Sequence, residues 1–436
     1  MDRAVRPGSS WQSPAAMPRR WLAGIFAISA IYAILVAVIS SDYVHQMWGT
    51  IAACGYGLAT VAALVPRKYL ISGRSTAGPD LAVVLAFVGG LVVPLCWLVA
   101  HDLRQPEVMV IARSGAGLIH HGTPYPSAAA LAATSNPNAY NPYLPVMSLF
   151  GVPRALADSP VTDPRIWFGL VFVVVFWLAL RAAGARDPAR WTVLITGCPV
   201  IAFTLATGGD DAPMVAFLCL GFAYLWRSVS VSRRGSEEPS PPWRDGPVMA
   251  GLALGLAAAM KATAWPAVAV GIALLAAACG RRAAFRFTLT AVSVFVVCVG
   301  PFLALDPKAL VENTVEFPLG LEHVVSAAAS PLPGYLIAET GHAGHTIVVA
   351  ALALAGLGIA ASLVFRPPRT VPRAMGLLAG AMTLMFLLAP STRYGYFIYP
   401  LCLVIWLLVA MAGRRQPRPG VAPDPGEPLA SSRTGS

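Results

Sequence analysis

Long apolar runs recur along the chain, and short polar segments separate them. Most runs approach the ~20 residues that a helix needs to cross ~30 Å of hydrocarbon. Lipid offers no hydrogen-bond partners to the backbone, and the runs are too long for barrel strands, so each run is expected to be a helix. The pattern predicts an all-α polytopic membrane protein with about twelve transmembrane helices, at 21–41, 48–65, 81–100, 165–183, 191–207, 212–226, 247–260, 263–279, 287–305, 345–365, 374–391 and 396–413.

The two ends of the chain differ from this transmembrane part, which spans 21–413. Residues 1–20 are rich in Ser, Pro and Arg, and residues 414–436 are rich in Pro, Arg, Gly and Ser. Such segments bury too little apolar surface to fold, so both are expected to be disordered tails. The first apolar run is longer than a signal-peptide core and is expected to stay as a helix.

Composition supports the membrane assignment: 57% of residues are hydrophobic and only 12% are charged. Basic residues occupy every second loop, which by the positive-inside rule places those loops and both termini in the cytoplasm of a plasma-membrane protein. The formal net charge of +11 therefore reflects topology, and nucleic-acid binding is not expected. The basic residues that this arrangement leaves outside or near the outer face are Arg104, Arg113, Arg154, Arg165, Lys261, Lys308 and Arg393.

Two loops on the predicted outer side are long, at 101–164 and 306–344. Long loops in a compact protein are often functional, and these two are expected to carry short interfacial helices. No cysteine has metal-ligand spacing, and His120-His121 has no third partner at recognisable spacing. No metal or cofactor is therefore expected.

The region 247–279 has two interpretations. Lys261 and Trp265-Pro266 interrupt it, so it forms either two short helices in a hairpin or one long helix. A single helix would place Arg281, Arg282 and Arg286 outside, so the hairpin is favoured.

Two carboxylates begin the first long loop. Asp102 and Glu107 follow an apolar run directly, and partial desolvation there would raise the basicity of either one for taking a proton from a hydroxyl. The alternative is that each only solvates a helix end. Arg113 follows in the same loop.

A tyrosine- and asparagine-rich segment comes next, and an acidic turn lies farther along. Tyr125, Tyr140, Asn141 and Tyr143 could bind a sugar, although tyrosines also favour membrane interfaces. Asp210 and Asp211, in the turn Thr207–Asp211, could hold a cation or sugar hydroxyls, or could simply close the turn.

Lys261 is the only lysine within an apolar stretch. An ionisable group in a membrane span indicates function by default, and a phosphate is a suitable partner; the alternative is snorkelling to the interface. Arg393, beside Tyr394 and Tyr396, combines a positive charge outside with tyrosines, as suits a phosphate or sugar-phosphate site.

Three of these features together resemble the C-type (GT-C) polyprenyl-phosphate-sugar-dependent glycosyltransferases, and among them glycosyltransferase family 87, which includes actinobacterial membrane mannosyltransferases. The features are Glu107 ahead of Gly122-Thr123-Pro124-Tyr125, the segment Tyr140–Pro145, and Met260-Lys261 after an alanine-rich helix. The resemblance spans roughly residues 81–412. Glu107 stands where the family usually has Asp, Asp102 lies close by, and two extra helices precede residue 81.

The resemblance implies a lipid-phosphate sugar donor, an outward-facing site and usually no metal. It favours transfer of a hexose, mannose first, from a polyprenyl phosphate to a glycolipid or glycan acceptor. Glu107 or Asp102 would be the general base, with Lys261, Arg393 and Arg113 on the donor phosphate. The rival hypotheses are a transporter or lipid flippase, and a non-catalytic scaffold.

Overall fold

The computed structural model describes residues 17–65, 80–234, 245–324 and 328–414. The predicted tails 1–20 and 414–436 lie almost wholly outside these ranges, as do the basic loop residues Arg67, Lys68, Arg74 and Arg244.

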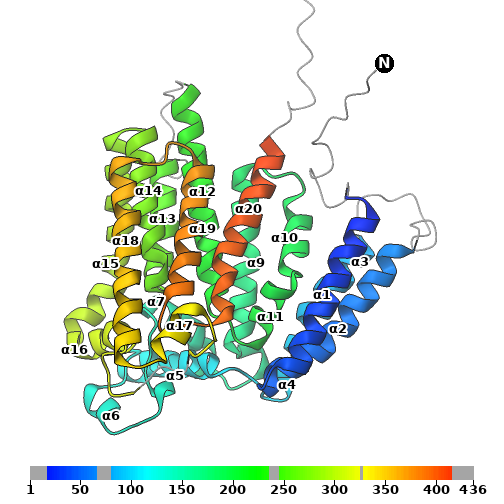
Figure 1. The fold of residues 1–436 in the computed structure, drawn as a ribbon, viewed down its shortest axis with the longest axis horizontal. Helices are drawn as coiled ribbons and strands as arrows, with labels where there is room; N and C mark the ends of the chain where they lie inside the picture. Colours follow the sequence, from blue (N-terminus) through cyan, green and yellow to red (C-terminus); the bar gives the residue numbers. More distant parts are fainter. Residues whose placement is uncertain (1–16, 66–79, 235–244, 325–327, 415–436) are drawn as a thin grey trace, which may run out of the picture.

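The described chain is a bundle of helices (Figure 1), and its only strand-like pairing is an isolated bridge between Ala329 and Thr392. An all-α polytopic membrane protein is therefore confirmed. Nine described helices are long and apolar enough to cross a membrane: α1 (Arg19–Ile39), α2 (Tyr43–Leu64), the continuous stretch α3–η3–α4 (Leu81–Phe87, Val88–Val92, Val93–Ala100), α9 (Pro164–Ala183), α12 (Asp211–Arg234), α15 (Arg281–Leu305), α18 (His342–Phe365), α19 (Val371–Leu388) and η10–α20 (Tyr394–Phe397, Ile398–Arg414).

The predicted span at 191–207 is a bent pair, α10 (Pro188–Thr196) and α11 (Pro199–Thr207), with 69° between the two helices. Pro199 explains the break, because a proline excludes the helical conformation from the residue before it. Counting this pair as one span gives up to ten spans among the described residues, so the predicted twelve are not established.

Two helices extend beyond the bounds predicted from the sequence. The apolar runs placed the end of one helix at 226 and the start of another at 287, whereas α12 continues to Arg234 and α15 begins at Arg281. Both extensions are rich in arginine. Hydrophobicity marks only the part of a helix that lies in hydrocarbon, and a helix can continue beyond it.

The region 247–279 is a hairpin, as predicted, of α13 (Gly246–Ala258) and α14 (Trp265–Ala278) joined through the turn η8 (Ala262–Ala264). Both helices pack against α15 and against each other. With 13 and 14 residues each is roughly 20 Å long, well short of ~30 Å of hydrocarbon. The turn that carries Lys261 therefore needs other parts of the chain to cover it.

That cover comes from the first long loop. The Leu144 N–H donates to the Met260 carbonyl at 3.0 Å, and the Val146 N–H donates to the Ala259 carbonyl at 3.2 Å. Carbonyls at the end of a helix lack partners within that helix, and here the loop backbone supplies them. The loop is thus fixed directly to the hairpin tip.

The short helices of both long loops gather at one end of the bundle (Figure 1), which we call the loop face. The described chain begins and ends at the opposite end. The helices of the loop face are α5 (Pro106–His121), α6 (Ala128–Ala132), η4 (Pro137–Ala139), α7 (Pro145–Ser148), η5 (Leu149–Gly151), α8 (Val152–Leu156), η6 (Pro160–Thr162), α16 (Pro307–Val311), η9 (Glu312–Glu316) and α17 (Pro333–Ala338).

The N-terminal helices join the bundle through a glycine contact. A Cβ atom added to Gly55 of α2 would lie 2.4 Å from the Gly89 Cα in η3. Small residues at such crossings let helix backbones approach closely, which is a principal source of helix association in lipid.

We expect Gly55→Val to destabilise the protein by about 1–3 kcal/mol, because the added side chain must push two backbones apart. Gly57→Val is the matched control, since a Cβ there meets nothing within 4 Å and the helix-propensity cost is the same. Unfolding in SDS-containing mixed micelles measures both. Equal losses of stability in the two variants would contradict the packing argument.

Candidate active site

Lys261 lies between two carboxylates on the loop face. Its Nζ is 3.1 Å from Asp210 Oδ2 and also forms an ion pair with Asp211. The three side chains are only 12%, 4% and 7% exposed. A buried ammonium is costly unless it is paired and hydrogen-bonded, and this lysine is paired on two sides.

Aromatic residues complete the surroundings of Lys261. The Tyr143 ring centroid is 4.9 Å from Nζ, a distance suited to a cation–π contact. The Tyr399 hydroxyl donates to Asp211 Oδ1 and lies 2.9 Å from the Thr263 hydroxyl. Side chains from α12, the hairpin turn, the first long loop and α20 therefore meet at one lysine.

The turn that presents the two acids depends on glycine. Gly208 has φ of 144°, in the left-handed half of the map where side chains are strained. A Cβ on Gly209 would lie 1.9 Å from the Thr204 side chain. The tight turn lets Asp211 begin α12, where the helix dipole favours a negative charge.

Glu107 and Arg393 form a second ion pair. Glu107 is in the first turn of α5, behind Pro106, and its side chain is 16% exposed. Its Oε2 atom is buried and has no hydrogen-bond partner in the described structure. Arg393 follows Thr392, whose backbone pairs with residues 328–330, so the second long loop holds it in place.

The two ion pairs are neighbours. The Gln105 N–H donates to the Thr207 carbonyl at 3.0 Å, which joins the segment before Glu107 to the segment before Asp210. Burial raises the pKa of Asp210 to about 6; Lys261 opposes this rise, and Asp211 and Glu107 add to it. Burial opposes the charge of Arg393, but Glu107 together with Tyr396, Tyr143 and Asp210 outweighs this effect, so the pKa of Arg393 is raised. We call Glu107, Arg393, Lys261, Asp210 and Asp211 the charged cluster.

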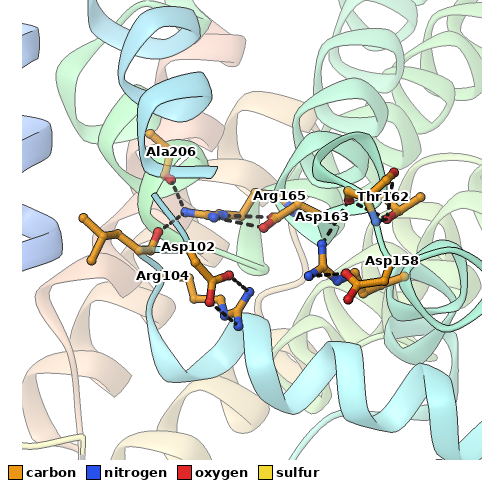
Figure 2. Close-up of polar contacts among 10 residues, drawn as sticks. Asp102, Arg104, Asp158, Thr162, Asp163, Arg165 and Ala206 are labelled. Carbon is orange, nitrogen blue, oxygen red and sulfur yellow. Dashed lines mark hydrogen bonds and ion pairs between the residues drawn. The ribbon is translucent and has the colours of Figure 1, made fainter. Parts of the chain in front are cut away.

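The structure does not bring Asp102 into the charged cluster. Its side chain is 69% exposed and pairs with Arg104 at 2.6 Å, and its φ of 54° turns the chain at the end of α4. Figure 2 shows this pair apart from the buried contacts beside it. The exposed position of Asp102 agrees with the alternative stated above, in which this acid only solvates a helix end.

Arg113 is not in the charged cluster either. Its Nη2 donates to the carbonyls of Asn138 and Ala139 at 2.7 and 2.9 Å. These contacts hold the loop before Tyr140 against α5. Both hydrogen bonds satisfy backbone groups, which indicates a structural part for this arginine.

The predicted substrate-binding tyrosines fall into different surroundings. Tyr140 is fully buried and its ring stacks on Phe317 at 4.2 Å, so its faces are covered. Tyr125 donates to the Tyr143 carbonyl. Tyr394 is 56% exposed.

Asn141 and Tyr396 also make contacts with other residues of the protein. The Asn141 N–H donates to Asn313 Oδ1, and its side-chain amide donates to the Pro124 carbonyl. Tyr396 packs 5.2 Å from Phe386. Asn141 joins the two long loops, while Tyr143 alone of the first-loop tyrosines faces Lys261.

Sequence reasoning missed a buried pair that holds both acidic segments (Figure 2). Arg165 is fully buried and binds Asp163 through Nε and Nη2, each at 2.9 Å. Its Nη1 donates to the Leu103 carbonyl at 2.7 Å and to the Ala206 carbonyl at 3.2 Å. Leu103 and Ala206 each lie four residues before an acid of the charged cluster. The sequence signal was an Asp-Pro-Arg helix start, which alone indicates only an N-cap.

A second missed contact comes from the N-terminal helices. His45, in the first turn of α2, is within hydrogen-bonding reach of the Gln105 side chain. The His45 Nδ1 lies 3.0 Å from the Ser40 hydroxyl, and its ring packs 4.9 Å from Phe203. The helices before residue 81 thus contact the residue that precedes α5.

We expect Arg165→Met to destabilise the protein by about 3–5 kcal/mol, because it leaves the buried Asp163 carboxylate without its charged partner. Arg154→Met is the matched control, since Arg154 pairs with Asp158, whose side chain is 81% exposed, and such pairs contribute about 1 kcal/mol or less. Unfolding titrations in SDS compare the two. A loss of stability in Arg165→Met no larger than in the control would contradict a stabilising role for the Arg165–Asp163 pair.

Comparison with known proteins identifies the family. Residues 141–390 match the sequence profile of glycosyltransferase family 87. No curated protein and no solved structure shows a significant match to the chain. The matched range contains Tyr143, Asp210, Asp211 and Lys261, whereas Glu107 lies 34 residues before it and Arg393 three residues after it. The match covers more than half of the chain, and the chain belongs to glycosyltransferase family 87.

Proposed function

We propose that this membrane glycosyltransferase transfers a hexose, mannose first by the resemblance, from a polyprenyl-phosphate donor to a glycolipid or glycan acceptor at the extracytoplasmic face of the plasma membrane. The observation that carries the proposal is the charged cluster. It sets two cations beside three carboxylates on the loop face of a membrane bundle, where a lipid-borne phosphate and a polar acceptor can both arrive.

Charge distribution supports this orientation. The end of the bundle opposite the loop face is rich in arginine, and two of these residues are in contact there, since Arg233 donates to the Arg369 carbonyl. Basic residues are enriched on the cytoplasmic side of membrane proteins, which supports a loop face on the outside and termini in the cytoplasm. Further described arginines near that end include Arg181, Arg186, Arg190, Arg227, Arg281, Arg282, Arg286, Arg366 and Arg373.

The donor phosphate is assigned to Lys261 and Arg393. Both are cations in a poorly solvated site, where charge–charge attraction is stronger than in water. As the bond between the anomeric carbon and the phosphate oxygen breaks, the phosphate leaves with the electron pair. The two cations stabilise the negative charge that grows on it.

Glu107 is assigned the role of general base in preference to Asp102. One of its oxygens binds Arg393 and the other is unpartnered, so a carboxylate oxygen is available for an acceptor hydroxyl. The acceptor oxygen attacks the anomeric carbon from the side opposite the phosphate while its proton passes to Glu107. One displacement of this kind inverts the configuration at the anomeric carbon.

No specific observation favours a transporter or flippase, or a non-catalytic scaffold. Membership of a glycosyltransferase family and the gathering of ionisable groups at one end of the bundle both support group transfer.

We expect Glu107→Gln to reduce sugar transfer by about 10²- to 10⁴-fold, the usual contribution of a general base. Asp102→Asn is the matched control and should keep nearly full activity, because Asp102 is exposed and outside the charged cluster. The assay is transfer from polyprenyl-phosphate-mannose in membranes with matched protein levels. Full activity in Glu107→Gln, or a large loss in Asp102→Asn, would reverse the assignment.

The orientation is tested by accessibility. In a background with all seven cysteines replaced, we expect Ser135→Cys to react with a membrane-impermeant maleimide in intact cells. Ser232→Cys should react only after the membrane is opened. Both positions are exposed, the first in the loop after α6 and the second near the far end of α12. The opposite pattern would place the charged cluster in the cytoplasm and exclude the proposed site of reaction.

A further inference from the structure

The charged cluster contains more acid than base. Glu107, Asp210 and Asp211 stand against Arg393 and Lys261, so the fully ionised cluster is net negative. A sugar phosphodiester brings one more negative charge. In a poorly solvated site, repulsion between like charges strongly opposes this addition. Binding of the donor therefore requires one of the carboxylates to move out of the cluster.

The two acids at Lys261 are held very differently. Asp211 is the first residue of α12, accepts a hydrogen bond from Tyr399 and contacts Lys261. Asp210 lies in the turn after two glycines. Its Oδ2 is 3.1 Å from Lys261 Nζ but receives no well-directed hydrogen bond from any described residue.

A lysine buried in this way needs a counter-ion to stay charged. A carboxylate and a phosphodiester can each pair with the ammonium in the same way, because each carries one negative charge shared by two oxygens. Replacing one by the other keeps Lys261 paired and leaves the charge of the cluster unchanged once the displaced carboxylate has turned away. The Gly208-Gly209 turn, which carries Asp210, lets the backbone next to this acid adopt conformations that other residues disfavour.

We propose that the Asp210 carboxylate occupies, in the empty enzyme, the place beside Lys261 that the donor phosphate takes, and that the donor binds by displacing it. This inference rests on the proposed function, in which Lys261 binds the donor phosphate. Asp211 has the separate part of fixing the position of Lys261 together with Tyr399. Asp210 thereby acts as a specificity-determining residue, because a ligand must bind Lys261 better than an attached carboxylate does.

The test uses methyl farnesyl phosphate, a short polyprenyl phosphodiester with the single negative charge of the donor, as the probe on the purified full-length protein in detergent, with farnesol as the control for micelle partitioning. We expect Asp210→Asn to bind the probe about tenfold more tightly than the wild type, because the competing charge is gone. Asp211→Asn removes the same charge but should bind no more tightly than the wild type. Asp210→Ser repeats the measurement with a smaller side chain, and size-exclusion profiles establish that each variant is folded.

The outcomes separate the inference from the function on which it rests. Equal tightening in Asp210→Asn and Asp211→Asn would show that total charge matters and position does not, which overturns the inference. Unchanged or weaker binding in both Asp210 variants overturns it as well. Lys261→Met should abolish probe binding. If Lys261→Met binds as the wild type does, the donor site itself is misplaced and the proposed function fails at this residue.

Discussion

Burial of the Lys261 ammonium is the constraint on which the rest of the site depends. An unpaired charge in a membrane bundle is too costly to persist, so the fold must bring acids to this lysine. Two of them come from the turn before α12, at 3.1 Å for Asp210 and in direct contact for Asp211. The Gly208-Gly209 turn meets that requirement, since both carboxylates that follow it contact one ammonium.

The short α13–α14 hairpin puts this lysine within reach of polar groups. A hairpin of full length would place its turn at the membrane surface, where a lysine is solvated and ordinary. Because α13 and α14 have only 13 and 14 residues, the turn stops short and the first long loop covers it through Leu144 and Val146. The same contacts place Tyr143 over Lys261, so the loop both completes the fold and forms one wall of the site.

Apolar run length was sufficient to locate the long helices, because lipid leaves the backbone no alternative to a helix, but it showed neither the bend between α10 and α11 nor the ends of α12 and α15. Lys261 could also be singled out from the sequence, since burying a charged side chain within an apolar run is costly. The exposure of Asp102 was not predictable, because it depends on the left-handed backbone conformation of Asp102 itself. Nor was the burial of Tyr140, which depends on Phe317, 177 positions away in the chain. The sequence identified Arg165 only as a basic residue near the outer face, because its carbonyl partners come together only in the folded protein.

The two halves of the charged cluster are a single unit even though the family range contains only one of them. Lys261 and its acids lie within residues 141–390, whereas Glu107 precedes that range and Arg393 follows it. The Gln105–Thr207 hydrogen bond and the Arg165 guanidinium tie the segment before Glu107 to the segment before Asp210. His45 extends the connection to α2. A shift of α5 would therefore move the turn beside Lys261 as well, so the position of Glu107 and the position of Asp210 and Asp211 are set by the same contacts.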